Sequence, residues 1–254
     1  MEYSRITAEM RDNACFIQFK SDNGKNCINS EFTMQLSDAL SKFSNECSVI
    51  VLEGNDDYFC YGADFEGIGR NVSNGSDEKD NPAELFDLWK QMTEAPCAII
   101  SHVKGAVNAG GVGFVSASDI VIASDKATFG LSELLFGLMP AMVMPFLIRR
   151  AGYSKAKYLT LTTKPVTAAL AYEYGIADIV SEHSDIVMRQ TVARLSKTPR
   201  DGIARYKQYM NSLCPITEDD KSLAVKANRL VFSDEVNLKR VADFALYGKY
   251  PWES

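Results

Sequence analysis

The sequence predicts an α/β core that is followed by a largely helical C-terminal region. Up to about residue 140, short apolar segments of strand length alternate with segments whose apolar residues recur at helical spacing. Beyond Pro140 the chain is largely helical in pattern, and no internal repeat or proline-rich linker divides the 254 residues. At the centre, an apolar run over 98–103 leads into a glycine-rich turn over 105–113. This order of strand, tight turn and helix start is typical of an α/β core.

The first third of the chain supplies strands with one helix between them. Asn29 and Ser30 offer an N-cap to this helix, whose apolar residues recur at helical spacing. Gly62 stands beside Ala63 in a loop that could present backbone amides to a ligand. The elements expected here are a strand at 15–19 within an alternating segment over 3–20, a helix over 31–43, a strand over 48–52 and a loop over 54–65.

The segment over 69–81 is polar and almost without apolar residues, so we expect it to be mobile and to act as a lid. Pro82 opens the next helix, and Ala95 and Pro96 end it. The later elements expected are strands over 98–103 and 119–123, a short strand entering a loop within 127–137, helices over 143–150, 154–162, 167–175 and 184–196, and a long helical segment that ends near 247.

Composition and charge exclude several classes of function. The net charge is -6, and no basic stretch is long enough to bind nucleic acid. No apolar run reaches membrane-spanning length and no signal-peptide pattern is present, so a cytoplasmic protein is expected. The six cysteines form no Cys-x-x-Cys pair, and with only His102 and His183 present we predict neither a metal site nor a Ser-His-Asp triad. We interpret His102 as a core histidine and assign any chemistry to carboxylates and backbone amides.

The glycine-rich turn does not match the phosphate-binding motifs. A phosphate loop needs a lysine and then serine or threonine after its second glycine, but Gly110 is followed by Gly111 and Val112. The Gly-x-Gly-x-x-Gly spacing of dinucleotide-binding turns does not occur either. Two interpretations remain, an amide that stabilises an oxyanion on a carbonyl and a helix that packs closely on a strand.

The chain resembles the crotonase, or enoyl-CoA hydratase/isomerase, superfamily over nearly its full length. The resemblance lies in the order and spacing of four segments, 26–29, 59–64, 105–113 and 129–133. It implies an α/β fold with a crotonase (ClpP-like) ββα-superhelix core over 1–195. It also implies a C-terminal helical extension over 196–254 that takes part in trimerisation and active-site closure, because the family commonly forms homo-trimers, often paired as hexamers.

The resemblance further implies site residues. The amides of Ala63 and Gly110 would form an oxyanion hole around a thioester carbonyl, and Glu133 would be the base that removes a proton from the neighbouring carbon. Hydratases of the family usually carry two glutamates, and Gly113 stands where the first would be. The residues expected to contact substrate are Asp64, Tyr61, Asn108, Gly111, Leu85 and Trp89.

Most of these contact residues also have a structural interpretation. Asp64 could equally be a helix cap, whereas packing or turn-stabilising roles are favoured for Tyr61 and Asn108. Leu85 and Trp89 lie on the apolar face of one helix, where they either pack the core or line an acyl pocket.

More narrowly, the chain resembles the dehydratases of polyketide β-branching cassettes, in segments 109–114, 131–137, 144–150 and 250–253. This implies dehydration of 3-hydroxy-3-methylglutaryl to 3-methylglutaconyl on the phosphopantetheine of an acyl-carrier protein, with no cofactor, and a partner crotonase that decarboxylates the product. Two alternatives stay open. One is a CoA-dependent enoyl-CoA hydratase/isomerase of fatty-acid type, and the other is a non-catalytic crotonase that binds acyl thioesters.

An acidic carrier protein would require a locally basic rim on this acidic chain. Two groups of basic residues are candidates for it, although solvated helix faces explain both equally well. They are Arg149, Arg150, Lys155 and Lys157, and Lys239, Arg240 and Lys249.

Overall fold

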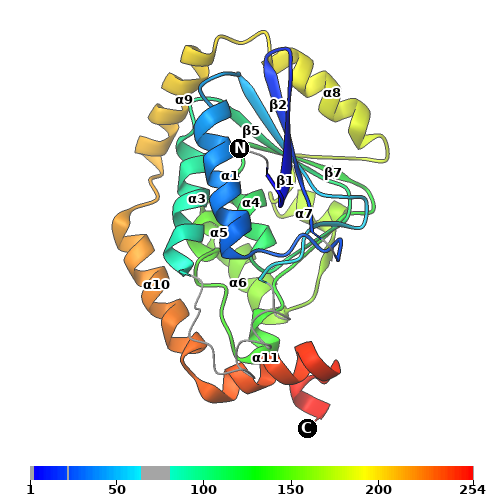
Figure 1. Ribbon diagram of the computed structural model, residues 1–254, viewed down its shortest axis with the longest axis vertical. Helices are drawn as coiled ribbons and strands as arrows, with labels where there is room; N and C mark the ends of the chain where they lie inside the picture. Colours follow the sequence, from blue (N-terminus) through cyan, green and yellow to red (C-terminus); the bar gives the residue numbers. More distant parts are fainter. Residues whose placement is uncertain (1–2, 22, 64–80, 254) are drawn as a thin grey trace.

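The computed structural model describes residues 3–21, 23–63 and 81–253 (Figure 1). Asp64 and all of the expected lid except Asn81 lie outside the described residues. The predicted α/β class is confirmed, since helices pack around a six-stranded and a four-stranded sheet.

The larger sheet has the strand order β1-β2-β3-β5-β7-β10. Its first pair is antiparallel and all later neighbours are parallel. The strands are β1 (Ile6–Arg11), β2 (Ala14–Phe19), β3 (Val49–Glu53), β5 (Ala98–Val103), β7 (Ile120–Ser124) and β10 (Ile179–Ser181).

The strand predicted within the alternating segment over 3–20 is confirmed as β2, and the part of the segment before it forms β1, so that the two strands make a hairpin. The chain reverses between Arg11 and Ala14, which are paired across the two strands. Asp12 occupies the turn with a φ of 51°, a left-handed conformation that aspartate tolerates better than most residues.

Both faces of the larger sheet are covered, as Figure 1 shows with α8 on one side and α1 and α3 on the other. Val49 and Val51 of β3 pack with α8 in one apolar cluster, and Ile50 and Leu52 belong to the main core on the opposite face. A parallel strand covered on both faces must be apolar throughout, which is why this strand is a continuous apolar run.

The helices begin and end close to where the sequence predicts. The Asn29 side chain accepts a hydrogen bond from the Phe32 amide, and Asn81 caps the helix that Pro82 opens. The helices are α1 (Ser30–Phe43), α3 (Pro82–Glu94), α4 (Gly111–Ala117), α5 (Met144–Ala151), α6 (Tyr153–Thr162), α7 (Ala168–Glu173), α8 (Ser184–Leu195), α9 (Arg200–Leu213), α10 (Glu218–Phe232) and α11 (Glu235–Tyr247), with 3-10 turns η1 (Glu133–Phe136) and η2 (Pro251–Glu253).

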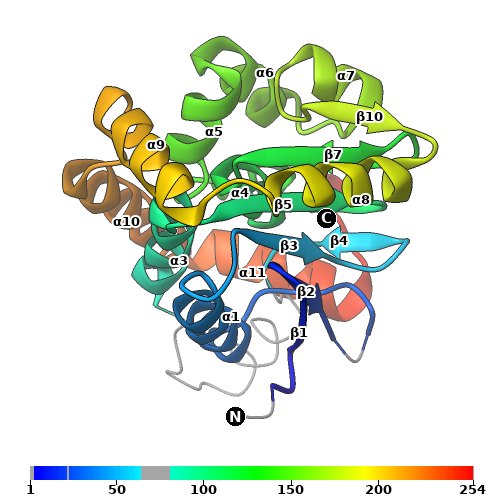
Figure 2. The same ribbon diagram turned by 90° about the horizontal axis from the view of Figure 1, so that it is seen from above.

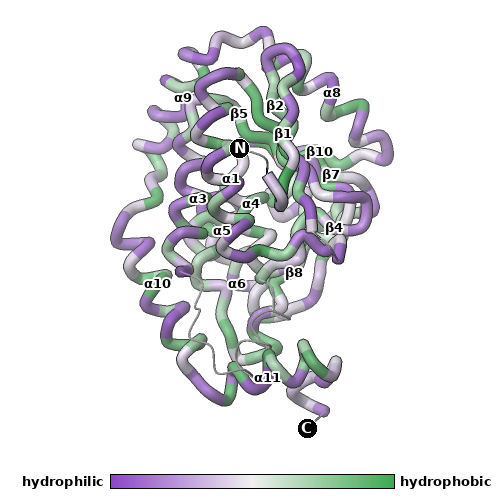
Figure 3. The backbone as a smooth tube through the Cα atoms, viewed as in Figure 1, coloured by the Kyte–Doolittle hydropathy of each residue, from purple (hydrophilic) through white to green (hydrophobic). Residues whose placement is uncertain are grey.

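The smaller sheet has the order β4-β6-β8-β9, and its first three strands are parallel. Figure 3 shows two of its strands, β4 and β8, below β7 and β10 of the larger sheet. Its strands are β4 (Tyr58–Cys60), β6 (Ala106–Asn108), β8 (Thr128–Gly130) and β9 (Val166–Thr167).

The long helical segment expected after residue 196 is three separate helices, α9, α10 and α11. Thr217 and Asp220 form a capping box that starts α10, and the Asp234 side chain accepts hydrogen bonds from two amides at the start of α11. Figures 1 and 2 show α10 and α11 beside and below the core, not along the sheet. The domain boundary at 195/196 stays a prediction.

One residue proposed for a basic rim is buried. Arg150 donates hydrogen bonds to the carbonyls of Ile176 and Ser118 and pairs with Asp178, so its guanidinium joins elements of the core. That assignment is therefore wrong for Arg150.

Candidate active site

The smaller sheet brings together three segments that the sequence singles out. Strands β4, β6 and β8 run parallel, and their carboxyl ends lead into residues 61–63, 109–111 and 131–133. Because the carboxyl ends of parallel strands meet at one edge, Ala63, Gly110 and Glu133 follow neighbouring strands there.

The first two of these segments touch. A Cβ placed on Gly62 would lie 2.7 Å from the Cβ of Ala109 and 3.3 Å from the Gly110 nitrogen. Gly62 also has a φ of 89°, which an L side chain rarely adopts. Glycine is thus required at 62 on two counts, and its presence lets the residue before Ala63 lie against residues 109 and 110.

The amides of these two residues are available. Within the described parts of the chain, no hydrogen bond uses the N–H of Ala63 or of Gly110. Ala109 has a φ of 49°, a strained value for alanine, while its own N–H donates to the Gly130 carbonyl at 3.0 Å. This hydrogen bond to strand β8 holds Ala109 in its strained conformation at the point where the chain enters α4.

Two further glycines let α4 approach its neighbours. A Cβ on Gly111 would lie 2.2 Å from the Cys60 carbonyl oxygen, and one on Gly113 would lie 2.2 Å from Cζ2 of Trp89. Gly111, expected at the substrate, is buried against this carbonyl. Both residues fit the close-packing interpretation of the glycine turn.

Glu133 begins η1 and is only 9% exposed. Its Oε2 has no hydrogen-bond partner in the described structure. Burial raises the pKa of this carboxyl to about 7, against a smaller lowering by a backbone hydrogen bond. A carboxyl with a pKa near neutrality can both accept and return a proton.

Neighbouring residues fix the segment that carries Glu133. The Asn108 side chain donates to Ser132 Oγ at 2.9 Å, which ties the glycine turn to this segment. On the other side, Asn237 of α11 donates to the Gly137 carbonyl at 3.1 Å. The sequence flags Asn108, but it gives no sign of Asn237, because this contact joins residues 100 positions apart.

The remaining expected contact residues differ in placement. Trp89 is fully buried and Leu85 is partly buried against the main core. Tyr61 is 42% exposed and stacks edge-on with Tyr58. The expected substrate role of Asp64 falls outside the described residues.

A second group of polar side chains lies at the end of the larger sheet. Among the residues described, Glu53, His102 and Asp185 lie close enough to one another to hold a metal ion. However, both ring nitrogens of His102 are engaged, with Glu53 at 2.7 Å and Ser184 at 3.0 Å, and Lys104 pairs with Asp185. The fully buried His102 is confirmed as a core histidine.

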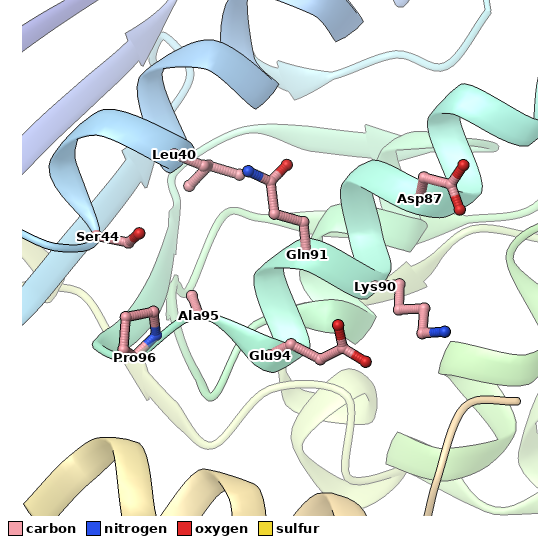
Figure 4. A pocket seen from close by; sticks show the side chains of 8 residues that line it. All are labelled: Leu40, Ser44, Asp87, Lys90, Gln91, Glu94, Ala95 and Pro96. Carbon is pink, nitrogen blue, oxygen red and sulfur yellow. The ribbon is translucent and has the colours of Figure 1, made fainter. Parts of the chain in front are cut away.

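The surface hollow in Figure 4 lies between α1 and α3 and contains none of Ala63, Gly110 and Glu133. Two of its three charged residues are paired across to α10, Lys90 with Glu218 and Asp87 with Lys221. In the described structure no helix combines the length and apolar character needed to cross a bilayer.

Comparison with known proteins supplies the family. Residues 9–253 match the family described as Enoyl-CoA hydratase/isomerase. The chain belongs to this family. It is 41% identical over 252 residues to Bacillaene synthase dehydratase PksH of Bacillus subtilis (strain 168), covering 99% of this chain and 97% of that protein. It is also 28% identical to the 2,3-dehydroadipyl-CoA hydratase of Escherichia coli (strain K12), over 78% of this chain and 76% of the relative.

Solved structures agree with the family assignment. The crystal structure of the polyketide biosynthesis enoyl-CoA hydratase pksH from Bacillus subtilis superposes with a TM-score of 0.95 at 41% identity, over 98% of this chain and 100% of the other. An enoyl-CoA hydratase from Mycobacterium avium paratuberculosis K-10, at 24% identity, shares the fold with a TM-score of 0.83 over 98% and 99% of the two chains. The expected crotonase fold is confirmed, and the chain is an enzyme of the family's hydro-lyase type.

Proposed function

We propose that this enzyme removes water from a 3-hydroxy-3-methylglutaryl group and forms 3-methylglutaconyl while the acyl group is a thioester on the phosphopantetheine of an acyl-carrier protein. The proposal rests on the buried Glu133 carboxyl, whose Oε2 has no partner in the described structure. Glu133 follows β8, and the neighbouring parallel strands β6 and β4 lead to Gly110 and Ala63, whose amides form no hydrogen bond among the described residues. The similarity to a dehydratase of bacillaene synthase supports the polyketide setting.

The chemistry needs one base and two amide donors. Glu133 takes a proton from the carbon beside the thioester, and the electron pair moves onto the thioester oxygen. The N–H groups of Ala63 and Gly110 donate to this oxygen, and each such donor contributes about 3 kcal/mol in a site that excludes water. The carbon–oxygen bond at C3 then breaks as the enolate collapses into the new double bond.

The departing hydroxyl leaves as water by taking the proton that Glu133 has just accepted. The carboxylate is then restored, so the cycle balances with a single carboxyl group. A cycle with one carboxyl group fits a chain that has glycine at 113, where hydratases of the family usually carry their first glutamate. No cofactor enters the proposed cycle.

Mass spectrometry of a carrier protein loaded with 3-hydroxy-3-methylglutaryl tests the proposal, with the CoA thioester in parallel. We expect loss of one water from the carrier-bound group. Glu133→Gln should abolish the loss and remain folded, whereas Glu173→Gln, an exposed residue on α7, should react normally. Normal turnover by Glu133→Gln would refute the assignment of the base.

Two results would favour the alternatives. Equal turnover of the CoA and carrier substrates, or hydration of simple enoyl-CoAs, would favour a CoA-dependent hydratase or isomerase. Binding without product in any thioester form would favour a non-catalytic scaffold. We also propose a homo-trimer, which sedimentation analysis of the free enzyme would test.

A further inference from the structure

Three buried polar side-chain atoms have no hydrogen-bond partner in the described structure, Ser116 Oγ among them, and the other two are of opposite hydrogen-bonding character. One is Nε1 of Trp89, which can only donate, and the other is Oε2 of Glu133, which accepts when the carboxyl is ionised. Trp89 is fully buried, and Glu133 is 9% exposed. Buried polar atoms are nearly always satisfied, so an unpaired donor and an unpaired acceptor require an explanation.

Trp89 lies against the helix that the Gly110 turn begins. The ring atoms Cζ2 and Cε2 would lie 2.2 and 2.4 Å from a Cβ on Gly113, and Cε2 is the atom that carries Nε1. Gly113 is one turn into α4, since its amide donates to the Gly110 carbonyl at 3.0 Å. The N–H edge of the indole therefore lies one helical turn from the proposed oxyanion amide.

The orientation of the indole is fixed. Phe114 and Phe146 pack edge-on against it, with centroids 5.7 Å away in each case. These rings are fully buried, so the indole cannot turn its N–H toward solvent. The absence of any side chain at Gly113 leaves the space that the indole fills.

The segment that carries Glu133 is joined to the same turn by hydrogen bonds. Asn108, two residues before Gly110, donates to Ser132 Oγ, and the Ala109 amide donates to the Gly130 carbonyl. A donor and an acceptor that have no partner in the described structure thus belong to residues on segments that contact or bond to the Gly110 turn and its helix. A hydroxyl group satisfies both at once, because its oxygen accepts from the indole and its hydrogen is donated to the carboxylate.

We propose that Trp89 is a catalytic residue whose Nε1–H donates a hydrogen bond to the C3 hydroxyl oxygen of the substrate. The inference rests on the proposed function and adds the group that holds the leaving oxygen. As the C3–O bond breaks, its electron pair moves to the oxygen, which the indole N–H stabilises. Glu133 returns its proton to that oxygen, and water departs with the carboxylate restored.

The test removes the N–H and keeps the ring. We would replace Trp89 by β-(3-benzothienyl)alanine, in which sulfur replaces the N–H group in a ring of nearly the same shape, and prepare Trp89→Phe beside it. Trp252→Phe, at a residue that is 62% exposed, is the matched control. Each protein is assayed for dehydration of the 3-hydroxy-3-methylglutaryl carrier and, in D2O, for proton exchange beside the thioester of a 3-methylglutaryl carrier, which lacks the hydroxyl.

We expect the benzothienyl variant to dehydrate roughly 10- to 100-fold more slowly, because a hydrogen bond to an atom that gains charge has about this effect. Proton exchange into the 3-methylglutaryl carrier should stay at the wild-type rate, since it needs only Glu133 and the two amides. Wild-type dehydration by this variant, or equal loss of both reactions, would overturn the role of Trp89. A wild-type enzyme that does not dehydrate the loaded carrier would instead overturn the proposed function itself.

Discussion

Glu133→Gln should make the protein more stable at neutral and higher pH while it removes activity. In the folded protein, burial raises the pKa of this carboxyl from 4.5 to about 7. At 1.36 kcal/mol per pKa unit, this corresponds to about 3 kcal/mol of folding free energy. Because the group is only 9% exposed, solvent screening reduces that figure little.

The direction of this pH dependence of stability follows from proton binding. Between pH 4.5 and about 7 the folded chain holds a proton on Glu133 that the unfolded chain has released. The contribution of this group to stability is therefore fully present below pH 4.5 and is lost as the pH rises through about 7. Glutamine does not titrate, so the variant should match the wild type in acid and exceed it by about 3 kcal/mol near pH 8.

Urea unfolding at fixed protein concentration, followed by tryptophan fluorescence, measures this difference across the pH range. Glu173→Gln, exposed on α7, controls for the loss of one negative charge at a site without burial. A difference between the wild type and Glu133→Gln that stays constant with pH would refute the burial argument.

Three further predictions concern the same site. The dehydration rate should rise with pH and reach half its maximum near pH 7, because Glu133 acts as a base only when ionised, and a pH–rate profile checks this. Gly113→Ala should lower the free energy of unfolding by about 1–3 kcal/mol through its clash with Trp89, whereas Gly202→Ala, with nothing within 4 Å, should raise it by about 0.5–1 kcal/mol; thermal unfolding compares the two. Asn237→Ala removes two hydrogen bonds to backbone carbonyls, so amide exchange should be faster throughout α11, and unchanged exchange would contradict its role as an anchor.

Local patterns were sufficient for most of the fold. The buried strands β3 and β5 are apolar runs, and α3 begins at a proline and ends before Ala95–Pro96. The structure differs from the sequence prediction where a single polar residue interrupts a longer regular pattern of apolar residues. Asp12 turns the chain within an alternating segment, and Thr217 starts a new helix within a helical one. Both residue types favour turns and caps, so the signals were present but brief.

The arrangement of the site depends on contacts that no local pattern contains. The resemblance assigned Glu133, but the unpaired state of its Oε2 arises from the way η1 is enclosed. Trp89 was expected either in the core or at the acyl group, and its contact with Gly113 joins residues 24 positions apart in the sequence. A glycine in a helix has several causes, and only the tertiary structure shows that an indole occupies the space beside this one.

The same burial that lowers stability makes one carboxyl sufficient for the proposed chemistry. A solvated glutamate, with a pKa near 4.5, would be ionised at pH 7 but would return its proton to a departing hydroxyl only weakly. With a pKa of about 7, the ionised and protonated forms of Glu133 have nearly equal free energy at pH 7. Glu133 can therefore both take the proton from carbon and give it to oxygen. Ionising the buried Glu133 costs about 3 kcal/mol of folding free energy. Contacts that hold η1 in place, from Asn108 on one side and Asn237 on the other, offset this cost. If those contacts were loosened, water would reach the carboxyl and its pKa would fall. Asn237→Ala should then shift the pH–rate midpoint toward acid, and a midpoint that stays near 7 would show that Asn237 holds α11 without controlling the burial of Glu133.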